Sequence, residues 1–324
     1  MLVLLLLLPP AGLVGCREAV PESLVLNFRE VFLSPGGELP LEVRALYPLS
    51  SGGAEARPVR EGLVFASSRP ELVRVDREGR VFMASGSSGT GAFLSGESAE
   101  VTVSLGELSA VCRFILRRDP RETLDARGYV KNPEAEDALV NKTRRLPDDY
   151  IPPDLVRVEV PTCLTLDEVN HLRLTASLAL SALFETARAE EGYTLTARSG
   201  YRAWKTQDYL YRANVETHGQ AYADQYSARP GTSEHQTGLV MDITSPGMNF
   251  QLDETFGWTG EGRWVAANAC RFGFIIRYPL GKEEITGYAY EPWHLRYVGP
   301  ALAEEIFRRK ICLEEFFLLP DTPW

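Results

Sequence analysis

Cysteine and histidine are scarce in this sequence, and basic residues do not gather in blocks. The 324 residues include 5 cysteines without a CxxC pair, so a zinc site built from thiolates is not expected. The formal net charge of −10 argues against nucleic acid as a partner, because phosphate binding needs a basic surface. With 324 residues and a hydrophobic content of 44%, the chain is long enough for one large or two medium domains with cores, and we expect two.

The N-terminal residues 1–16, MLVLLLLLPPAGLVGC, form an apolar run that is too short to span a bilayer comfortably. Such a run is typical of a secretory signal. Its end, Leu13-Val14-Gly15-Cys16, resembles the lipobox of bacterial lipoproteins, in which the cysteine is lipidated and becomes the mature N-terminus. No lysine or arginine precedes the run, so a plain cleaved signal or an uncleaved anchor stays open. We expect residues 1–21 to be a signal segment, Cys16 to carry a lipid, and the protein to lie in the cell envelope, anchored to the membrane or secreted.

Residues 22–118 read as a series of short alternating segments broken by glycine, serine and proline, which predicts an all-β sandwich. The stretch SSRPELVRVDREGRVFMA resembles the bacterial immunoglobulin-like domains of surface proteins, with Phe65 at a position that is often tryptophan there. The resemblance implies a spacer or adhesive module without catalysis.

A charged segment with prolines and a glycine, residues 119–135, is expected to be a linker. Residues 136–324 mix helical and strand patterns and are predicted to form an α+β domain. Expected elements are a helix over 166–190 opened by a capping box of Thr165 and Glu168, a helix over 203–223, a hairpin-like segment over 287–299 and a last helix over 300–310. A disulfide between Cys270 and Cys312 is a weak hypothesis, and free buried thiols are preferred.

The run from Ser227 to Thr244, SARPGTSEHQTGLVMDIT, contains a histidine in a polar turn and an aspartate in an apolar strand. An acidic group in an apolar strand is costly unless it is paired. His235 and Asp242 can converge only if the backbone turns between them, and Gly238 allows such a turn. A divalent metal, with zinc as a good candidate, would bind both side chains. A surface histidine followed by an ordinary strand explains the same residues, so this run alone leaves the alternative open.

The segment Glu291-Pro292-Trp293-His294 supplies what the first run lacks. His294 would complete a site of three protein ligands with an open position, which is the pattern of a catalytic zinc. Glu291 would then act as the general base toward water. Alternatively, Glu291 pairs with Arg296 on the surface and His294 is a buried, hydrogen-bonded histidine.

Arg202 ends a predicted strand at the glycine turn SGYR. Its guanidinium suits a substrate carboxylate or the oxyanion of a tetrahedral intermediate. A surface salt bridge is the other interpretation.

Four separated motifs, SGYR, SARPGTSEHQTGLVMD, GFIIRYP and EPWHLRYVG, together resemble the zinc D-alanyl-D-alanine carboxypeptidase family of VanY type, from about Leu139 to Phe316. The resemblance implies zinc ligands at His235, Asp242 and His294, a general base at Glu291 and a transition-state arginine at Arg202. It also implies a compact α+β fold whose antiparallel sheet holds the zinc in a cleft. Gln207 and Ser233 match positions near the bound peptide. Val240 stands where the family often has alanine.

The expected function is removal of a terminal D-alanine from peptidoglycan stem peptides by a monomeric, membrane-tethered enzyme. Related enzymes cleave L,D bonds or act as endopeptidases, and sequence does not separate these activities. A non-catalytic wall-binding lipoprotein is the rival from another class, and the presence of Glu291 argues against it.

Overall fold

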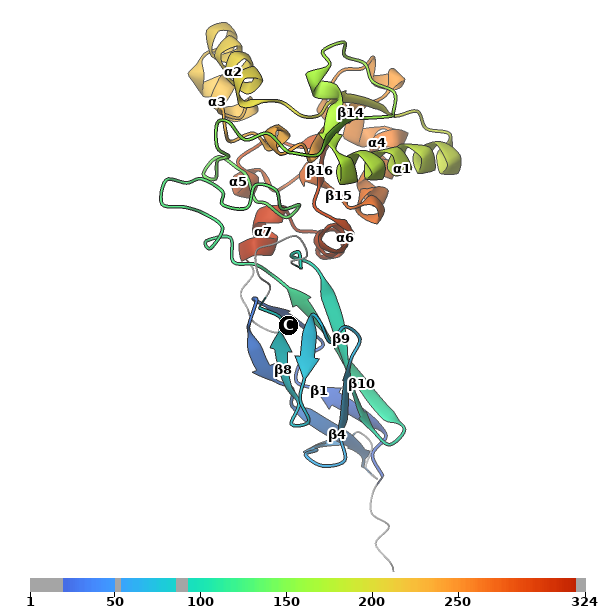
Figure 1. Ribbon diagram of the computed structural model, residues 1–324. Helices are drawn as coiled ribbons and strands as arrows, with labels where there is room; N and C mark the ends of the chain where they lie inside the picture. The colour runs from blue at the N-terminus through green and yellow to red at the C-terminus, as the bar shows by residue number, and fades with distance from the viewer. Residues whose placement is uncertain (1–19, 50–53, 86–92, 319–324) are drawn as a thin grey trace, which may run out of the picture.

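The computed structural model describes residues 20–49, 54–85 and 93–318 (Figure 1). Cys16, expected to carry a lipid, lies outside these residues. Within the described ranges, no helix has the length and apolar character needed to cross a membrane.

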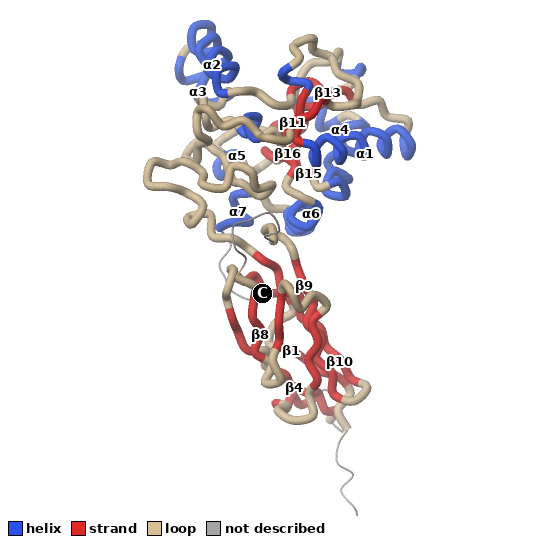
Figure 2. The backbone as a smooth tube through the Cα atoms, in the orientation of Figure 1, coloured by secondary structure: helices blue, strands red, loops and turns tan. Residues whose placement is uncertain are grey.

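The described part of residues 20–118 consists of strands and loops without a helix (Figure 2). The strands are β1 (Ser23–Leu26), β2 (Glu30–Leu33), β3 (Glu38–Pro40), β4 (Val43–Pro48), β5 (Ala54–Pro58), β6 (Val64–Ser67), β7 (Val73–Val75), β8 (Arg80–Met83), β9 (Ser98–Leu105) and β10 (Leu108–Leu116). They form three sheets in the orders β1-β4-β5, β2-β10-β9-β6 and β3-β8-β7. Alternate residues of β9, Ala99, Val101 and Val103, are buried in the core between the sheets, as the period of two requires. The all-β character agrees with the sequence pattern, and the immunoglobulin-like assignment stays a prediction.

The C-terminal part is built around one sheet of four antiparallel strands in the order β13-β14-β16-β15. Its strands and α-helices are β11 (Leu155–Arg157), β12 (His171–Arg173), α1 (Leu174–Glu191), β13 (Thr196–Ser199), α2 (Trp204–His218), α3 (Gln220–Tyr226), β14 (Val240–Thr244), α4 (Gly260–Asn268), β15 (Phe274–Tyr278), α5 (Glu283–Thr286), β16 (Glu291–Tyr297), α6 (Pro300–Arg309) and α7 (Leu313–Leu318). Short 3-10 helices are η1 (Glu168–Asn170), η2 (Glu234–Thr237), η3 (Pro246–Met248), η4 (Glu254–Trp258) and η5 (Ala269–Phe272).

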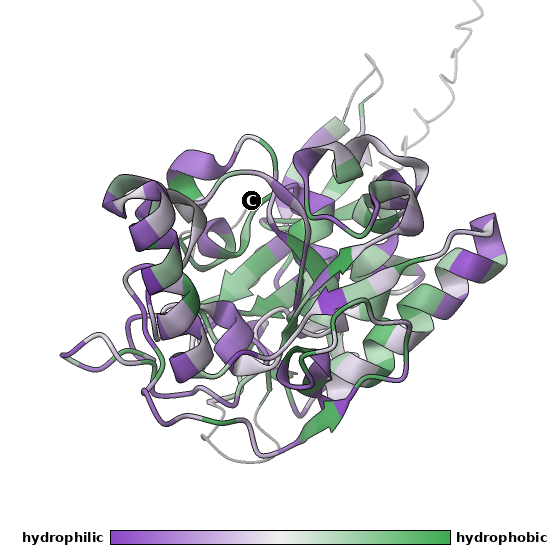
Figure 3. Cartoon of the chain, turned by 90° about the horizontal axis from the view of Figure 1, so that it is seen from above, coloured by the Kyte–Doolittle hydropathy of each residue, from purple (hydrophilic) through white to green (hydrophobic). Residues whose placement is uncertain are grey.

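The central strands have one apolar face and one polar face. Met241 and Ile243 of β14 and Leu295 of β16 belong to the same core as the buried residues of α1 and α4. Because side chains alternate along a strand, Asp242 and His294 point away from this core. Figure 3 shows hydrophobic residues concentrated in the central strands. The polar face of β14 and β16 is therefore free to hold a site.

The helix predicted over 166–190 starts eight residues later in the structure, at Leu174 of α1. The preceding residues form η1 and then β12, which pairs with β11 and so cannot be helical. The prediction of a capping box formed by Thr165 and Glu168 is therefore wrong. The Glu168 carboxylate instead accepts hydrogen bonds from the backbone of Ala203 and the hydroxyl of Thr206, at the start of α2.

Three other predicted elements also differ. The helix over 203–223 is broken into α2 and α3 at Gly219, whose φ of 86° does not continue a helix. The segment over 287–299 is not a hairpin by itself, because it contains the single strand β16, whose partners β14 and β15 lie outside it. A further short helix, α7, follows the expected last helix. Cys112, Cys163, Cys270 and Cys312 are free thiols, so the disulfide hypothesis for Cys270 and Cys312 is wrong.

The segment expected as a linker, residues 119–135, is folded rather than extended. Val130 is buried with Val140 and Leu146 in a small apolar core.

A second core joins the two parts of the chain, with Phe32 and Ile115 of the β-rich part against Leu302, Ile306 and Phe316 of α6 and α7. Figure 1 shows α6 and α7 at this junction, above the β-rich part.

Candidate metal centre and cavity

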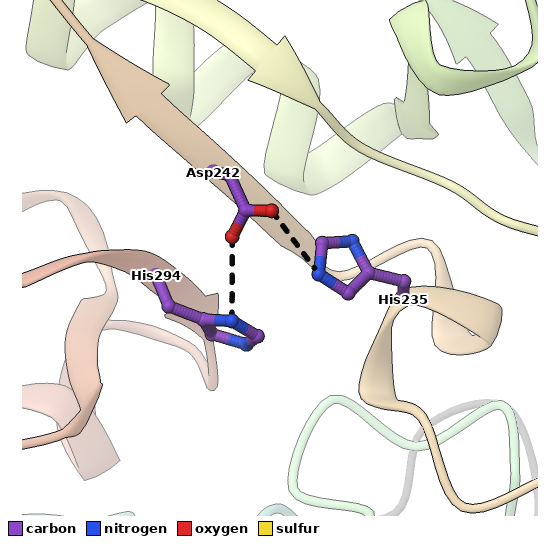
Figure 4. A group of neighbouring side chains, drawn as sticks. All are labelled: His235, Asp242 and His294. Carbon is purple, nitrogen blue, oxygen red and sulfur yellow. Dashed lines mark ion pairs between the residues drawn. The ribbon is translucent and has the colours of Figure 1, made fainter. Parts of the chain in front are cut away.

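Asp242 and His294 meet because β14 and β16 are neighbouring antiparallel strands in which these two residues are paired directly. Residues opposite each other in such a pair have side chains about 5 Å apart at Cβ. Oδ1 of Asp242 lies 3.3 Å from Nδ1 of His294 (Figure 4). Sheet register alone thus brings together two residues that are distant in the sequence.

His235 approaches the same aspartate from η2, which precedes β14. Its Nε2 lies 3.4 Å from Oδ2 of Asp242 (Figure 4). The turn between them uses Gly238 in the left-handed region, with φ of 66°, so the freedom expected at this glycine is used. Nδ1 of His235 donates to the carbonyl oxygen of Gly200 at 2.7 Å, which leaves the lone pair of Nε2 facing Asp242.

The three side chains form a group suited to a metal ion. One ligand atom from each of His235, Asp242 and His294 lies within 4.8 Å of the others, and all three residues are buried. Within the described ranges, Oδ1 of Asp242 is buried without a hydrogen-bond partner, which is costly for a carboxylate unless a cation is bound. Two imidazole nitrogens and one carboxylate oxygen form a donor set that zinc accepts, with a fourth position left for water or substrate. The residues present therefore fit zinc.

Without a metal, the surroundings of the two histidines shift their pKa values in opposite directions. Burial, and then the charge of Arg202, lowers the pKa of His235 to about 3. Burial opposes protonation of His294 as well, but the carboxylates of Asp242 and Glu291 outweigh it and raise the pKa of that imidazole to about 9. Burial alone would raise the pKa of Asp242, yet His235 and His294 hold it below its ordinary value.

Glu291 lies at the start of β16, beside the metal group. The register between β15 and β16 shifts here, so that Glu291 is paired with Tyr278. Its Oε2 is 3.2 Å from Nδ1 of His294, and its side chain is 17% exposed. The carboxylate can thus reach both the metal group and solvent, as a general base must. The alternative pairing of Glu291 with Arg296 does not occur, since Arg296 is buried against Glu234.

Arg202 follows β13 and lines the same cavity. Its backbone N–H donates to the carbonyl oxygen of His235 at 3.2 Å, whereas Nε of its guanidinium is buried and has no partner among the residues that the structure describes. Burial lowers the pKa of Arg202, although the charges of Asp242 and Glu291 counteract this. No salt bridge to Arg202 is found in the described part of the chain, so the surface-pair interpretation does not hold. A half-buried guanidinium whose Nε has no hydrogen-bond partner among the described residues is suited to an anionic group of a ligand.

The cavity has a volume of about 290 Å³ and brings together every residue that the sequence predicted for the site. The predicted residues that line it are Arg202, Gln207, Ser233, His235, Asp242, Glu291 and His294. Nε2 of Gln207 is engaged with the backbone oxygen of Ala228 at 2.7 Å, so only its Oε1, which has no partner, is available to a ligand. Ser233 is buried next to η2.

Several wall residues were missed by sequence reasoning. Leu210 and Asn214 of α2 share a helical face with Gln207. Tyr278 is the last residue of β15, and Tyr288 lies in the segment that follows this strand. The spacing of 207, 210 and 214 fits one face of a helix, which is a signal that the sequence does contain. Tyr278 lies with its ring centroid 4.8 Å from that of His294, a contact set by strand register and not by any local pattern.

Comparison with known proteins agrees with this geometry. The model of the VanY family, D-alanyl-D-alanine carboxypeptidase, matches residues 169–300. The chain is 46% identical over 195 residues to the putative carboxypeptidase YodJ of Bacillus subtilis (strain 168), covering 60% of this chain and 71% of that protein. Among solved structures, the LdcB LD-carboxypeptidase has a TM-score of 0.57 and 46% identity, covering 59% of this chain and 89% of LdcB. A mutant of the vancomycin-resistance D,D-pentapeptidase VanY, solved in complex with Zn(II), has a TM-score of 0.45 and 36% identity, covering 56% of this chain and 98% of that chain.

Proposed function

Because the chain belongs to the VanY family of D-alanyl-D-alanine carboxypeptidases, we propose that it removes the terminal D-alanine from peptidoglycan stem peptides. Zinc is the cofactor of this family. The observation that carries the proposal is the meeting of His235, Asp242 and His294 with Glu291 and Arg202 around one cavity. Family membership supports a peptidoglycan carboxypeptidase, and the finer assignment to the D-alanyl-D-alanine bond is our first candidate.

The roles of the residues follow from their chemistry. When bound by His235, Asp242 and His294, zinc supplies a Lewis acid that polarises the scissile carbonyl and makes the attacking water more acidic. Glu291 accepts the proton of that water and passes it to the leaving amine of D-alanine. Arg202 donates hydrogen bonds to the terminal carboxylate or to the developing oxyanion, since its Nε has no partner in the part of the chain that the structure describes.

An L,D-carboxypeptidase is the second candidate, and one observation favours it. The LdcB LD-carboxypeptidase is 46% identical to this chain and has a TM-score of 0.57. Both activities release the same amino acid, but from different stem peptides, because the residue before the scissile bond has opposite configuration. An internal cut by an endopeptidase would release no free alanine.

Defined muropeptides separate these activities. The purified protein is incubated with pentapeptide and tetrapeptide muropeptides, and the products are weighed by mass spectrometry. We expect loss of one alanine from the pentapeptide, while loss from the tetrapeptide alone would establish the L,D candidate. Internal cleavage would establish an endopeptidase. Binding of muropeptides without any product would overturn the enzyme assignment in favour of a wall-binding lipoprotein.

We further propose that the protein is an extracytoplasmic monomer tethered to the membrane through Cys16. The support is the lipobox-like tetrad that ends at Cys16, together with a substrate class that lies in the cell wall. Figure 1 adds that the described chain begins at the end of the β-rich part that is distant from the C-terminal part, as a spacer would require. Cys16→Ser should move the protein from the membrane fraction to the soluble envelope fraction. An unchanged distribution would contradict lipid anchoring.

A further inference from the structure

The carboxylate of Glu234 is buried, yet the roles described above do not use it. Its side chain and those of Arg277 and Arg296 have no exposed surface. Oε1 of Glu234 accepts hydrogen bonds from Nε of Arg277 at 2.8 Å and from Nη1 of Arg296 at 2.9 Å. Arg277 is held in turn by Glu314 of α7, at 2.8 and 2.6 Å. Buried charges are tolerated when they are paired in this way, and the two arginines hold Glu234 through its Oε1.

The other oxygen of Glu234 is directed at a metal ligand. Oε2 is buried and has no hydrogen-bond partner in the described part of the chain, and the same holds for Nε2 of His294. The two atoms are 4.0 Å apart. A shift of about 1 Å would bring them within the range of a hydrogen bond. On the opposite side of the same ring, Nδ1 faces Asp242 and Glu291.

We propose that Glu234 is a positioning residue that accepts the Nε2–H of His294 and thereby keeps the lone pair of Nδ1 available to zinc. A neutral imidazole carries its proton on one nitrogen only, so a fixed acceptor at Nε2 selects the tautomer that ligates through Nδ1. The inference rests on the proposed zinc-dependent function.

The same turn therefore orients both histidines. Within η2, Glu234 directs its Oε2 at His294, and the neighbouring His235 is held through its Nδ1 by the carbonyl of Gly200. Each imidazole has one nitrogen facing a fixed acceptor and the other facing Asp242. The carbonyl that serves His235 is neutral, whereas the group that serves His294 is a carboxylate, which is the stronger acceptor.

Glu234→Gln tests the assignment. The amide oxygen would keep the two arginine hydrogen bonds, so the amide nitrogen would face Nε2 of His294 as a donor. The ring would then have to carry its proton on Nδ1, where zinc should bind. We expect a zinc affinity 10- to 100-fold weaker than wild type in a competition with a chromophoric chelator, the usual effect of losing a supporting hydrogen bond to a ligand.

Glu314→Gln is the matched control. It removes the same charge from the same buried network, but Glu314 contacts Arg277 and not His294. We expect its zinc affinity to stay within about twofold of wild type, although both variants lose stability. Equal weakening in the two variants, or unchanged affinity in Glu234→Gln, would overturn the role of Glu234.

A measurement on the wild-type protein covers the case in which Glu234→Gln does not fold. The protein is labelled with ¹⁵N-histidine, its metal site is filled with ¹¹³Cd, and the sample is studied by NMR. We expect cadmium coupling to Nδ1 of His294, with its Nε2 protonated. Coupling to Nε2 would overturn the inference. If wild type binds neither zinc nor cadmium, the proposed function fails as well, whereas normal zinc-dependent cleavage with Nε2 ligation refutes only the role of Glu234.

Discussion

Glu291 is the residue whose loss should affect chemistry most and binding least. Glu291→Gln removes the proton acceptor but preserves size, so kcat should fall about 10²- to 10⁴-fold while zinc content is unchanged. Product release measured at saturating muropeptide, together with metal analysis, checks this. Glu284→Gln, an exposed residue of α5, serves as the control and should retain full activity. A fall of less than about threefold in Glu291→Gln would contradict its role as general base.

Arg202 should be sensitive even to a conservative change. Lysine keeps the charge but lacks the planar fork that binds two oxygens, so Arg202→Lys should lower kcat/KM by about 10²- to 10³-fold. Arg198→Lys, on β13 and bonded to the backbone oxygen of Phe250, is the matched control. Equal activity in the two variants would show that Arg202 does not contact the substrate.

The metal-free protein should have a stability maximum near pH ~6.5, because the two ligand histidines titrate in opposite directions. The pKa of His235 is lowered to about 3, so its stabilising contribution is present above the unfolded value of about 6.5 and is lost as the pH falls toward 3. The pKa of His294 is raised to about 9, so its contribution is present below about 6.5 and is lost as the pH rises to 9.

Thermal unfolding in the presence of a chelator, from about pH 4 to about pH 9.5, measures this dependence. His294→Ala should remove the decline on the alkaline side. A wild-type midpoint that stays constant between about pH 6.5 and 9 would contradict the coupling of His294 to Asp242 and Glu291.

At the scale of elements, the turn η2 and strand β14 hold the site together, and Gly238 joins them. A Cβ at Gly238 would lie 2.8 Å from Cδ2 of Leu155, in addition to the strain of its positive φ. Gly192 ends α1 with a similar φ of 72°, but a Cβ there would meet no atom within 4 Å, so Gly192→Ala isolates the conformational cost.

We expect Gly192→Ala to lose about 1 kcal/mol of unfolding free energy with zinc affinity unchanged. Gly238→Ala should lose more, and its zinc affinity should fall because His235 and Asp242 flank the turn. Urea unfolding and chelator competition measure the two effects. If both variants lost the same free energy and bound zinc equally well, the turn would not control the site.

Features that depend on a local sequence pattern could be predicted, whereas features that depend on contacts between residues far apart in the sequence could not. The convergence of His235, Asp242 and His294 was predicted through the resemblance of their motifs to the VanY family, because the local pattern of each segment alone left other interpretations open. The start of α1 could not be predicted, because residues 171–173 are fixed as a strand by pairing with β11 and not by their own pattern. Glu234 was overlooked for the same reason, since its significance depends on Arg277 and Arg296, which are far away in the sequence.

At the scale of the whole molecule, the β-rich part and the C-terminal part are joined by an apolar core and by ion pairs. Phe32 of β2 contacts Phe316 of α7 with ring centroids 5.8 Å apart. Glu305 of α6, whose side chain is fully buried, accepts from Nη1 of Arg113 on β10 at 2.9 Å. The junction resembles a domain core, and we expect the two parts to unfold together.

Phe32→Ala should break this coupling. A cavity in place of a buried phenylalanine costs about 3–5 kcal/mol. Calorimetry should show one transition in wild type and two in the variant, with muropeptide cleavage preserved at low temperature. Val64→Ala, at a position 65% exposed on β6, is the control and should unfold as wild type does. Two transitions in wild type would contradict a rigid junction.

Zinc restoration tests whether hydrolysis by this protein depends on zinc held by His235, Asp242 and His294. The wild-type protein is stripped with a chelator and titrated with zinc while D-alanine released from a pentapeptide muropeptide is measured. We expect no release without metal and full activity at one equivalent of zinc, with no recovery in His294→Ala. Full release of D-alanine by the stripped wild-type protein would contradict it.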